Sequence, residues 1–127
     1  MKLMTKELER KFKKIGSQRN VEDPIVVAKF FNPTGGATWY CTEYDAKNRE
    51  FYGYASLFGD HCDEWGWTSL DELQEFKGRF GLGIERDLYF ESKQISLVCP
   101  KAVRKFERGD ESGIGEDGVC ELYEETG

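Results

Sequence analysis

The chain has 127 residues, of which 39% are hydrophobic and 33% are charged, and its net charge at pH 7 is −6. This length and composition predict one folded domain, residues 1–127, and exclude a disordered acidic chain. No run approaches the roughly 18 apolar residues that cross a bilayer, and the charged N-terminal stretch lacks the apolar region of a signal peptide. We therefore expect a cytoplasmic protein with no membrane partner.

Charge is distributed unevenly along the chain. The first 20 residues hold seven Lys and Arg against two Glu, whereas residues 107–127 hold eight Asp and Glu against one Arg. A basic beginning and an acidic end attract each other, although exposed ion pairs contribute only about 0–1 kcal/mol each and salt screens them.

The cysteines are widely spaced and form no C-x-x-C pair. They are Cys41, Cys62, Cys99 and Cys120. In a reducing compartment this spacing predicts free thiols that are mostly buried as small hydrophobic groups.

The first predicted element is a helix that begins after Thr5, whose hydroxyl can cap the first turn. Leu8, Phe12 and Ile15 recur at helical spacing, and Gly16 is suited to end the helix. Beyond a polar connection, residues 25–31 are apolar on both faces, as in a central strand.

Three further runs rich in strand-forming residues follow, at 37–44, 51–58 and 64–69. Short turns join the first three runs, which favours an antiparallel meander over a parallel sheet. Gly53 interrupts one run and indicates a bulge or a close backbone contact. In the fourth run, Trp65 and Trp67 are two residues apart and are expected on one face.

Ser69 and Glu72 have the spacing of a capping box at the start of a short helix. Gly78 stands where a left-handed residue ends such a helix. The glycines of "GRFGLG" therefore follow a helix, whereas a phosphate-binding loop precedes one. Their spacing matches neither the dinucleotide nor the P-loop fingerprint, so we expect a turn, no cofactor, and then a strand over residues 86–90.

Several segments, in this order along the chain, resemble the bacterial domain-of-unknown-function family 2958: "MKLMTKELERKF", "DPIVVAKFFNPTGGATWYCTEYD", "FYGYASLFG" and "SLDELQEFKGRFGLGIERDLYF". The likeness runs from Met1 to about Ser96. It implies an α+β fold: an antiparallel meander of four to five strands, an N-terminal helix and a short capped helix before the last family strand. It also implies an accessory role in plasmids, phages or other mobile elements. Residues 97–127 form an acidic extension beyond the resemblance, expected to be partly mobile.

The loop "GDHCDEW" holds His61, the single histidine, beside Asp60, Cys62, Asp63 and Glu64. A zinc site needs about four ligands placed tetrahedrally, and neighbouring residues of one loop do not point at one ion easily. The sequence therefore predicts no metal site.

Glu85, Arg86 and Asp87 form a charged corner next to the glycines. In a strand, Glu85 and Asp87 would share one face and could act as acid and base. Alternatively, Arg86 binds a carboxylate, such as that of Glu43 or Glu72, and fixes the turn to the sheet; we favour this structural interpretation.

The predicted strands are also rich in aromatic residues. Sheet aromatics stack on bases in single-strand binders, but such proteins add a cationic groove, which these strands lack, so nucleic acid is not the expected partner. The tentative binding residues are Trp39, Tyr40, Tyr52, Tyr54, Glu85, Arg86 and Asp87.

Two functional hypotheses remain. The first is a non-catalytic module that binds another protein, with counter-defence or nucleic-acid mimicry by the acidic residues as a specific form; no catalytic residues are assigned. The second is a small hydrolase-like or metal-assisted enzyme that uses Asp60, His61 and Glu85.

Overall fold

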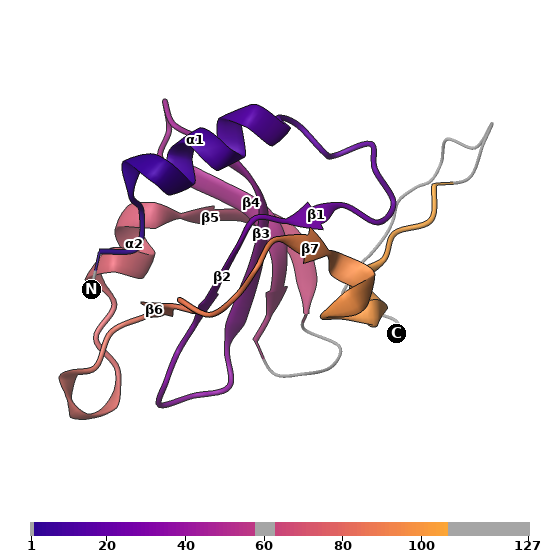
Figure 1. The fold of residues 1–127 in the computed structure, drawn as a ribbon. Coiled ribbons are helices and arrows are strands. Elements are labelled where there is room, and N and C mark those ends of the chain that lie inside the picture. The colour runs from indigo at the N-terminus through magenta and orange to yellow at the C-terminus, as the bar shows by residue number, and fades with distance from the viewer. Residues whose placement is uncertain (1, 58–62, 107–127) are drawn as a thin grey trace.

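The computed structural model describes residues 2–57 and 63–106. Its larger sheet contains β2 (Ala28–Phe31), β3 (Thr38–Asp45), β4 (Glu50–Ser56), β5 (Glu64–Ser69) and β6 (Glu85–Arg86). The helices are α1 (Lys6–Ile15) and α2 (Leu70–Glu75); β1 (Ile25–Val26) and β7 (Lys93–Gln94) form a separate pair. Three single 3-10 turns complete the elements: η1 (Arg79–Gly81), η2 (Ile95–Leu97) and η3 (Pro100–Ala102). The predicted α+β fold is confirmed, with α1 lying across the sheet (Figure 1).

The strand order in the larger sheet is β5-β4-β3-β2-β6, and every neighbouring pair is antiparallel. The first four strands form the predicted meander. After β5 the chain passes through α2 and η1 and returns to the opposite edge, where β6 pairs with β2 (Figure 1). The predicted strand over residues 25–31 is divided at Val27 into β1 and β2.

The sequence signals for α1 act as predicted. The Thr5 hydroxyl accepts a hydrogen bond from the Leu8 N–H at 3.1 Å, and Gly16 ends the helix with a φ of 76°. Leu8 and Phe12 are buried against the sheet, so the charged residues of α1 face outward.

The start of α2 was also predicted, because the Ser69 hydroxyl accepts a hydrogen bond from the Glu72 N–H at 3.1 Å. The predicted end at Gly78 is wrong. Phe76 already leaves the helical conformation, and its N–H donates to the Glu72 carbonyl at 3.1 Å. The predicted turn is present, but its left-handed residues are Phe80 and Gly81.

Each face of the sheet packs against its own hydrophobic cluster. On the face toward α1, Phe12, Phe30 and Phe51 form the centre, with ring centroids 4.9–5.7 Å apart. On the second face, Tyr54 packs with Ile95, which belongs to a segment beyond the larger sheet. The described structure therefore has three layers: α1 and α2, the sheet, and the chain from β7 to Phe106.

The last layer is held to the second face by polar contacts as well as by packing. The Trp65 Nε1 donates to the Ala102 carbonyl at 3.0 Å, and the Lys101 Nζ lies 2.6 Å from an oxygen of Asp63, whose side chain is fully buried. No helix in the described ranges is long and apolar enough to cross a membrane.

Two cysteines can be compared with the prediction. Cys41 and Cys99 are free and buried, as expected. Cys62 and Cys120 lie outside the described residues.

Candidate interaction surface

A β-bulge in β3 determines which side chains reach the second face of the sheet. Cys41 pairs with Gly53, but the next pair joins Glu43 to Tyr52, which leaves Thr42 as an extra residue. In a regular strand Cys41 and Glu43 would share a face. The extra residue turns Glu43 away from the aromatic cluster under α1 and onto the second face.

Gly53 permits this bulge. A Cβ atom at position 53 would lie 2.1 Å from the carbonyl oxygen of Tyr40 and 2.8 Å from the Cα of Cys41. Both atoms are backbone and cannot move aside as a side chain can. The predicted close backbone contact at Gly53 is confirmed.

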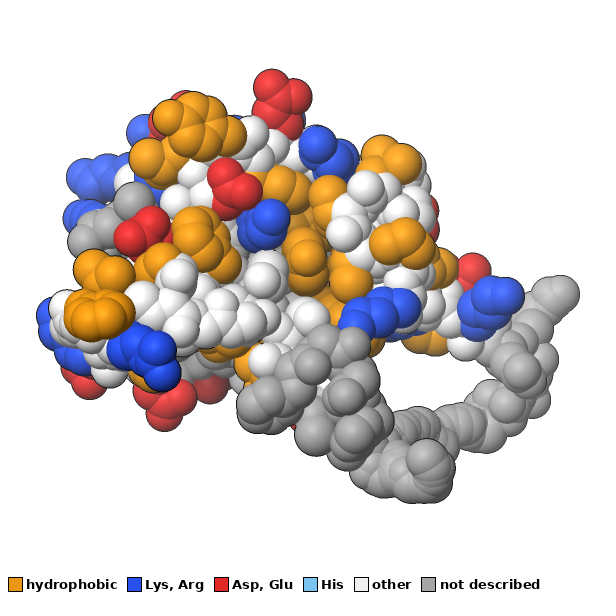
Figure 2. Space-filling view, turned by 90° about the horizontal axis from the view of Figure 1, so that it is seen from below, with side chains coloured by type: hydrophobic (Ala, Val, Ile, Leu, Met, Phe, Trp, Pro, Cys, Tyr) orange, Lys and Arg blue, Asp and Glu red, His pale blue; other side chains and the backbone are white. Residues whose placement is uncertain are grey.

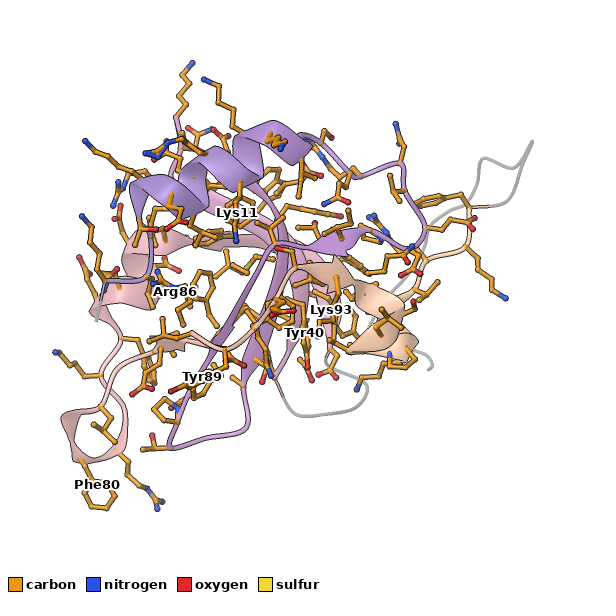
Figure 3. All side chains as sticks on the ribbon, viewed as in Figure 1. Lys11, Tyr40, Phe80, Arg86, Tyr89 and Lys93 are labelled. Carbon is orange, nitrogen blue, oxygen red and sulfur yellow. The ribbon has the colours of Figure 1, made fainter. Side chains whose placement is uncertain are left out.

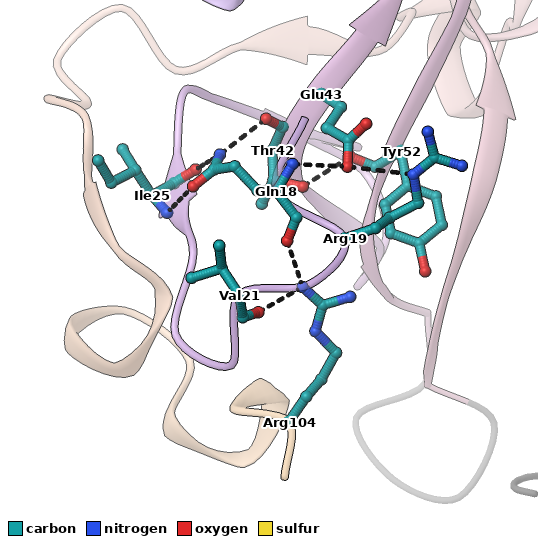
Figure 4. A network of polar contacts seen from close by, with 8 residues as sticks. All are labelled: Gln18, Arg19, Val21, Ile25, Thr42, Glu43, Tyr52 and Arg104. Atoms are coloured by element: carbon teal, nitrogen blue, oxygen red, sulfur yellow. Dashed lines mark hydrogen bonds and ion pairs between the residues drawn. The ribbon is translucent and has the colours of Figure 1, made fainter. Parts of the chain in front are cut away.

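Glu43 is at the centre of a buried polar network, drawn in Figure 4. Its carboxylate accepts a hydrogen bond from the Gln18 N–H at 3.0 Å and lies 3.4 Å from the Arg19 Nε. The Gln18 amide donates to the carbonyls of Ile25 and Thr42 and accepts from the Ile25 N–H, at 2.7–2.9 Å. The network fixes the connection between α1 and β1 to the bulge.

Arg104 joins the end of the described chain to the same network. Its Nη2 donates to the carbonyls of Gln18 at 2.9 Å and Val21 at 2.6 Å (Figure 4). Its guanidinium carbon lies 4.1 Å from the centroid of the Trp65 ring, a distance at which a cation–π attraction is strong. Burial lowers the pKa of Arg104. This residue therefore clamps the third layer in place.

The structure separates the predicted aromatic binding residues. Tyr40, Tyr52 and Tyr54 reach the second face, whereas Trp39 packs against the core under α1. Burial is the main cause that raises the pKa of Tyr54 to about 12. The third layer packs against Tyr40 and Tyr54 on this face.

At the uncovered end of this face, Tyr52 contacts both Trp65 and Trp67, with ring centroids 5.8 Å and 5.2 Å away. The two tryptophans thus share a face, as predicted. The Arg19 guanidinium lies 5.3 Å from the centroid of the Trp67 ring. Trp67 is 42% exposed, so this edge of the aromatic cluster reaches the surface.

Arg86 and Asp87 of the charged corner make contacts within the fold. Arg86 Nη1 donates to the carbonyl of Leu3 at 2.8 Å and to that of Lys2 at 3.3 Å, which ties the start of the chain to β6. Asp87 lies 3.5 Å from the Lys29 Nζ. Glu43, one carboxylate expected to bind Arg86, is bound by Arg19 instead.

The predicted strand over residues 86–90 is wrong beyond Arg86. The Asp87 carboxylate accepts a hydrogen bond from the Tyr89 N–H at 3.0 Å, and its carbonyl accepts one from Phe90 at 3.3 Å. This short-range bonding turns the chain. Glu85 and Asp87 therefore do not form the strand-based acid–base pair considered above. Asp60 and His61 lie outside the described residues. Among the described residues, no three side chains of His, Cys, Asp or Glu are close enough together to hold a metal ion.

The same turn leaves large apolar side chains in solvent. Residues 76–89 hold Phe76, Phe80, Leu82, Leu88 and Tyr89, which are exposed by 41%, 88%, 43%, 61% and 95%. The other large hydrophobic residues of the described chain that are exposed by at least 36% are Val21, Ile25, Trp67, Leu97 and Phe106. Figure 2 shows hydrophobic side chains at the end of the molecule formed by the η1 turn. We name residues 76–89 the apolar segment.

A groove of about 210 Å³ lies between α1 and β6 and borders the apolar segment at Leu88. Charged side chains line it, among them Lys11, Lys29 and Asp87. Its volume is below the roughly 300–1,000 Å³ of small-molecule pockets.

No sequence pattern predicts a role for Phe80, Leu88, Gln18 or Arg104. The first two were missed because the glycine turn and an apparent strand gave no reason to expect exposure. The other two act through long-range contacts that no local pattern indicates.

A family model described as "Protein of unknown function (DUF2958)" matches residues 3–105. No curated protein and no solved structure matches the chain. The match passes Ser96, the expected limit of the resemblance, and includes η2 and η3, so the third layer lies within the family match.

Proposed function

Because the chain belongs to the DUF2958 family, whose function is unknown, we propose a function from its own surface: it is a non-catalytic module that binds another protein through the apolar segment. One observation carries this proposal. Half of the exposed large hydrophobic residues of the described chain fall within residues 76–89. Exposed apolar side chains that gather in one place mark interaction sites.

The backbone of the apolar segment adds support. Phe80 has a φ of 59°, which is uncommon for a bulky residue, yet its side chain is 88% exposed and fills no core. The Gly78 N–H donates to the Leu82 carbonyl at 2.7 Å, and the Gly81 N–H donates to the Gly78 carbonyl at 3.1 Å. These bonds hold the turn in one shape, which lowers the entropy lost on binding.

Figure 3 shows Phe80 directed away from the sheet at the tip of the η1 turn, with Tyr89 closer to the strands. Aromatic and Arg side chains contribute most to the affinity of protein interfaces. Arg79, next to Phe80, is exposed as well. The segment thus has the residue types of an interface centre.

A protein is a better partner than a nucleic acid. Residues 76–89 hold three Lys and Arg against two Asp and Glu, whereas binding to phosphates needs a surplus of cations. A protein-binding module also agrees with the mobile-element accessory role that the resemblance implies. Mimicry of nucleic acid would fall to residues 107–127, since the first 106 residues hold 17 Lys and Arg against 16 Asp and Glu.

The test uses affinity capture from cells that carry the gene, with the tagged full chain and two variants. The double variant Phe80→Ala, Tyr89→Ala removes two exposed rings, whereas Leu97→Ala removes a 70% exposed side chain on η2 as a matched control. A loss of about 2 kcal/mol per ring, typical of such residues, reduces capture of the partner more than 100-fold in the double variant. The control should retain the partner.

Thermal unfolding verifies that both variants remain folded. Equal capture by the double variant and the control would contradict the proposal.

A further inference from the structure

The outer face of α1 is strongly cationic. Lys6, Arg10, Lys13 and Lys14 recur at i, i+4, i+7 and i+8, so they form one stripe along the helix. All four are exposed, and the buried residues Leu8 and Phe12 lie on the opposite side. Figure 3 shows long side chains with nitrogen tips that extend from α1 away from the sheet.

Glu9 lies among these cations, so the stripe keeps a surplus of three positive charges (four Lys and Arg against one Glu). The ion pairs among the described residues involve Arg19, Lys29, Arg49 and Lys101, and none involves the four α1 cations. Lys6 with Arg10, and Arg10 with Lys14, are like charges four residues apart, an arrangement that destabilises a helix. An anionic partner on this face would remove the repulsion.

The chain itself contains a segment of the complementary charge. Residues 107–127 hold eight Asp and Glu against one Arg. We infer that these residues dock on the outer face of α1, where their carboxylates pair with Lys6, Arg10, Lys13 and Lys14. The inference does not rest on the apolar segment or on the function proposed for it.

The place where the described chain ends favours this docking. The Phe106 N–H donates to the Glu22 carboxylate at 2.8 Å, and the Arg104 N–H donates to the Glu22 carbonyl at 2.9 Å. Glu22 lies in the connection between α1 and β1. The described chain therefore ends, at Phe106, beside the connection that leaves the C-terminal end of α1, where Lys13 and Lys14 form the last basic turn.

The length of the segment is sufficient. A chain of 21 residues spans up to roughly 70 Å when extended, and a domain of this size has a radius of gyration of about 13 Å. A tethered segment meets its site at an effective concentration near the millimolar range, so several weak pairs suffice. Because exposed pairs are screened by salt, docking should weaken as ionic strength rises. Docking would also shield α1 from other polyanions.

The test places a nitroxide spin label on Cys120 of the full chain. Cys62→Ser leaves Cys120 as the target, since Cys41 and Cys99 are 2% and 7% exposed. Paramagnetic broadening of backbone amide signals then reports which residues lie near position 120. At about 20 mM salt we expect the α1 amides to lose more than half of their intensity, and at about 500 mM salt we expect them to regain it.

Two double variants with equal changes in net charge test whether the α1 cations cause the broadening. Lys6→Glu with Lys13→Glu should abolish the broadening of α1, whereas Lys47→Glu with Lys77→Glu changes the net charge equally at exposed positions elsewhere and should preserve it. Broadening that is absent from α1 at low salt would overturn the inference. So would broadening that centres on Phe80 and Tyr89, or that survives the charge reversal on α1.

Binding of a duplex DNA of about 20 base pairs tests whether α1 is open to another polyanion. If α1 lies under the acidic residues, changing Asp110, Glu111, Glu116 and Asp117 to their amides should increase DNA binding at low salt at least tenfold. Equal binding before and after this change would show that α1 is open to a polyanion, which contradicts docking.

Discussion

The substitution Gly53→Ala tests whether the bulge in β3 organises the sheet. The added Cβ would lie 2.1 Å from the Tyr40 carbonyl oxygen, whereas ordinary contacts begin at 3.4 Å. The two central strands must therefore separate by roughly 1 Å at this point. A backbone hydrogen bond of ordinary length does not survive such a shift.

The expected cost follows from the groups that lose their partners. Two broken backbone bonds beside the bulge leave four unsatisfied groups, which give about 4 kcal/mol at the low end of the usual range of about 1–3 kcal/mol for each group. Domains of this size are stable by only about 5–15 kcal/mol, so Tm should fall by about 15 °C or more. The turn of Glu43 toward the second face would be disturbed as well.

Urea unfolding followed by tryptophan fluorescence measures this change. The matched control is Gly66→Ala on β5, because Gly66 is the register partner of Gly53 and a Cβ there meets no atom within 4 Å. The control should stay within about 0.5 kcal/mol of the natural chain. A Gly53→Ala variant that also stays within about 1 kcal/mol would refute the account of the bulge.

Glu43→Ala leaves the buried Gln18 N–H without its acceptor, so we expect about 2–3 kcal/mol of lost stability in the same urea assay. The bidentate contact from Arg49 lowers the pKa of Asp71. This pair therefore stabilises the folded state at pH values above the unfolded-state pKa of Asp71, about 3.9, and the stabilisation is lost as the pH falls through the lower pKa of the folded state. We expect Arg49→Gln to raise the titration midpoint of Asp71 in an NMR experiment. The same variant should reduce Tm at pH 7 but not at pH 2. Burial raises the pKa of the thiols of Cys41 and Cys99, so iodoacetamide followed by peptide mass mapping should find both unmodified until denaturant is added.

The local elements were predictable because short-range bonds define them. Thr5 and Gly16 set the ends of α1, and Ser69 sets the start of α2. The meander also followed from the short turns between the strand-forming runs. In each case the residues that decide the structure are neighbours in the sequence.

The remaining features depend on contacts between distant parts of the chain. Gly53 indicated a bulge, but only the pairing of β3 with β4 shows that Glu43 changes face. The alternation after Glu85 suggested a strand, whereas the Asp87 carboxylate turns the chain there. The third layer, which Arg104 holds against the second face of the sheet, corresponds to no periodic pattern in the sequence.

The most direct test of the proposed function is photo-crosslinking in cells that carry the gene. A benzophenone amino acid placed at Phe80, or at Leu97 as the control, reacts with whatever protein lies against that position. We expect a specific covalent partner from position 80, lost when Tyr89 is replaced by Ala, and none from position 97. No crosslink from position 80, or the same products from both positions, would contradict it.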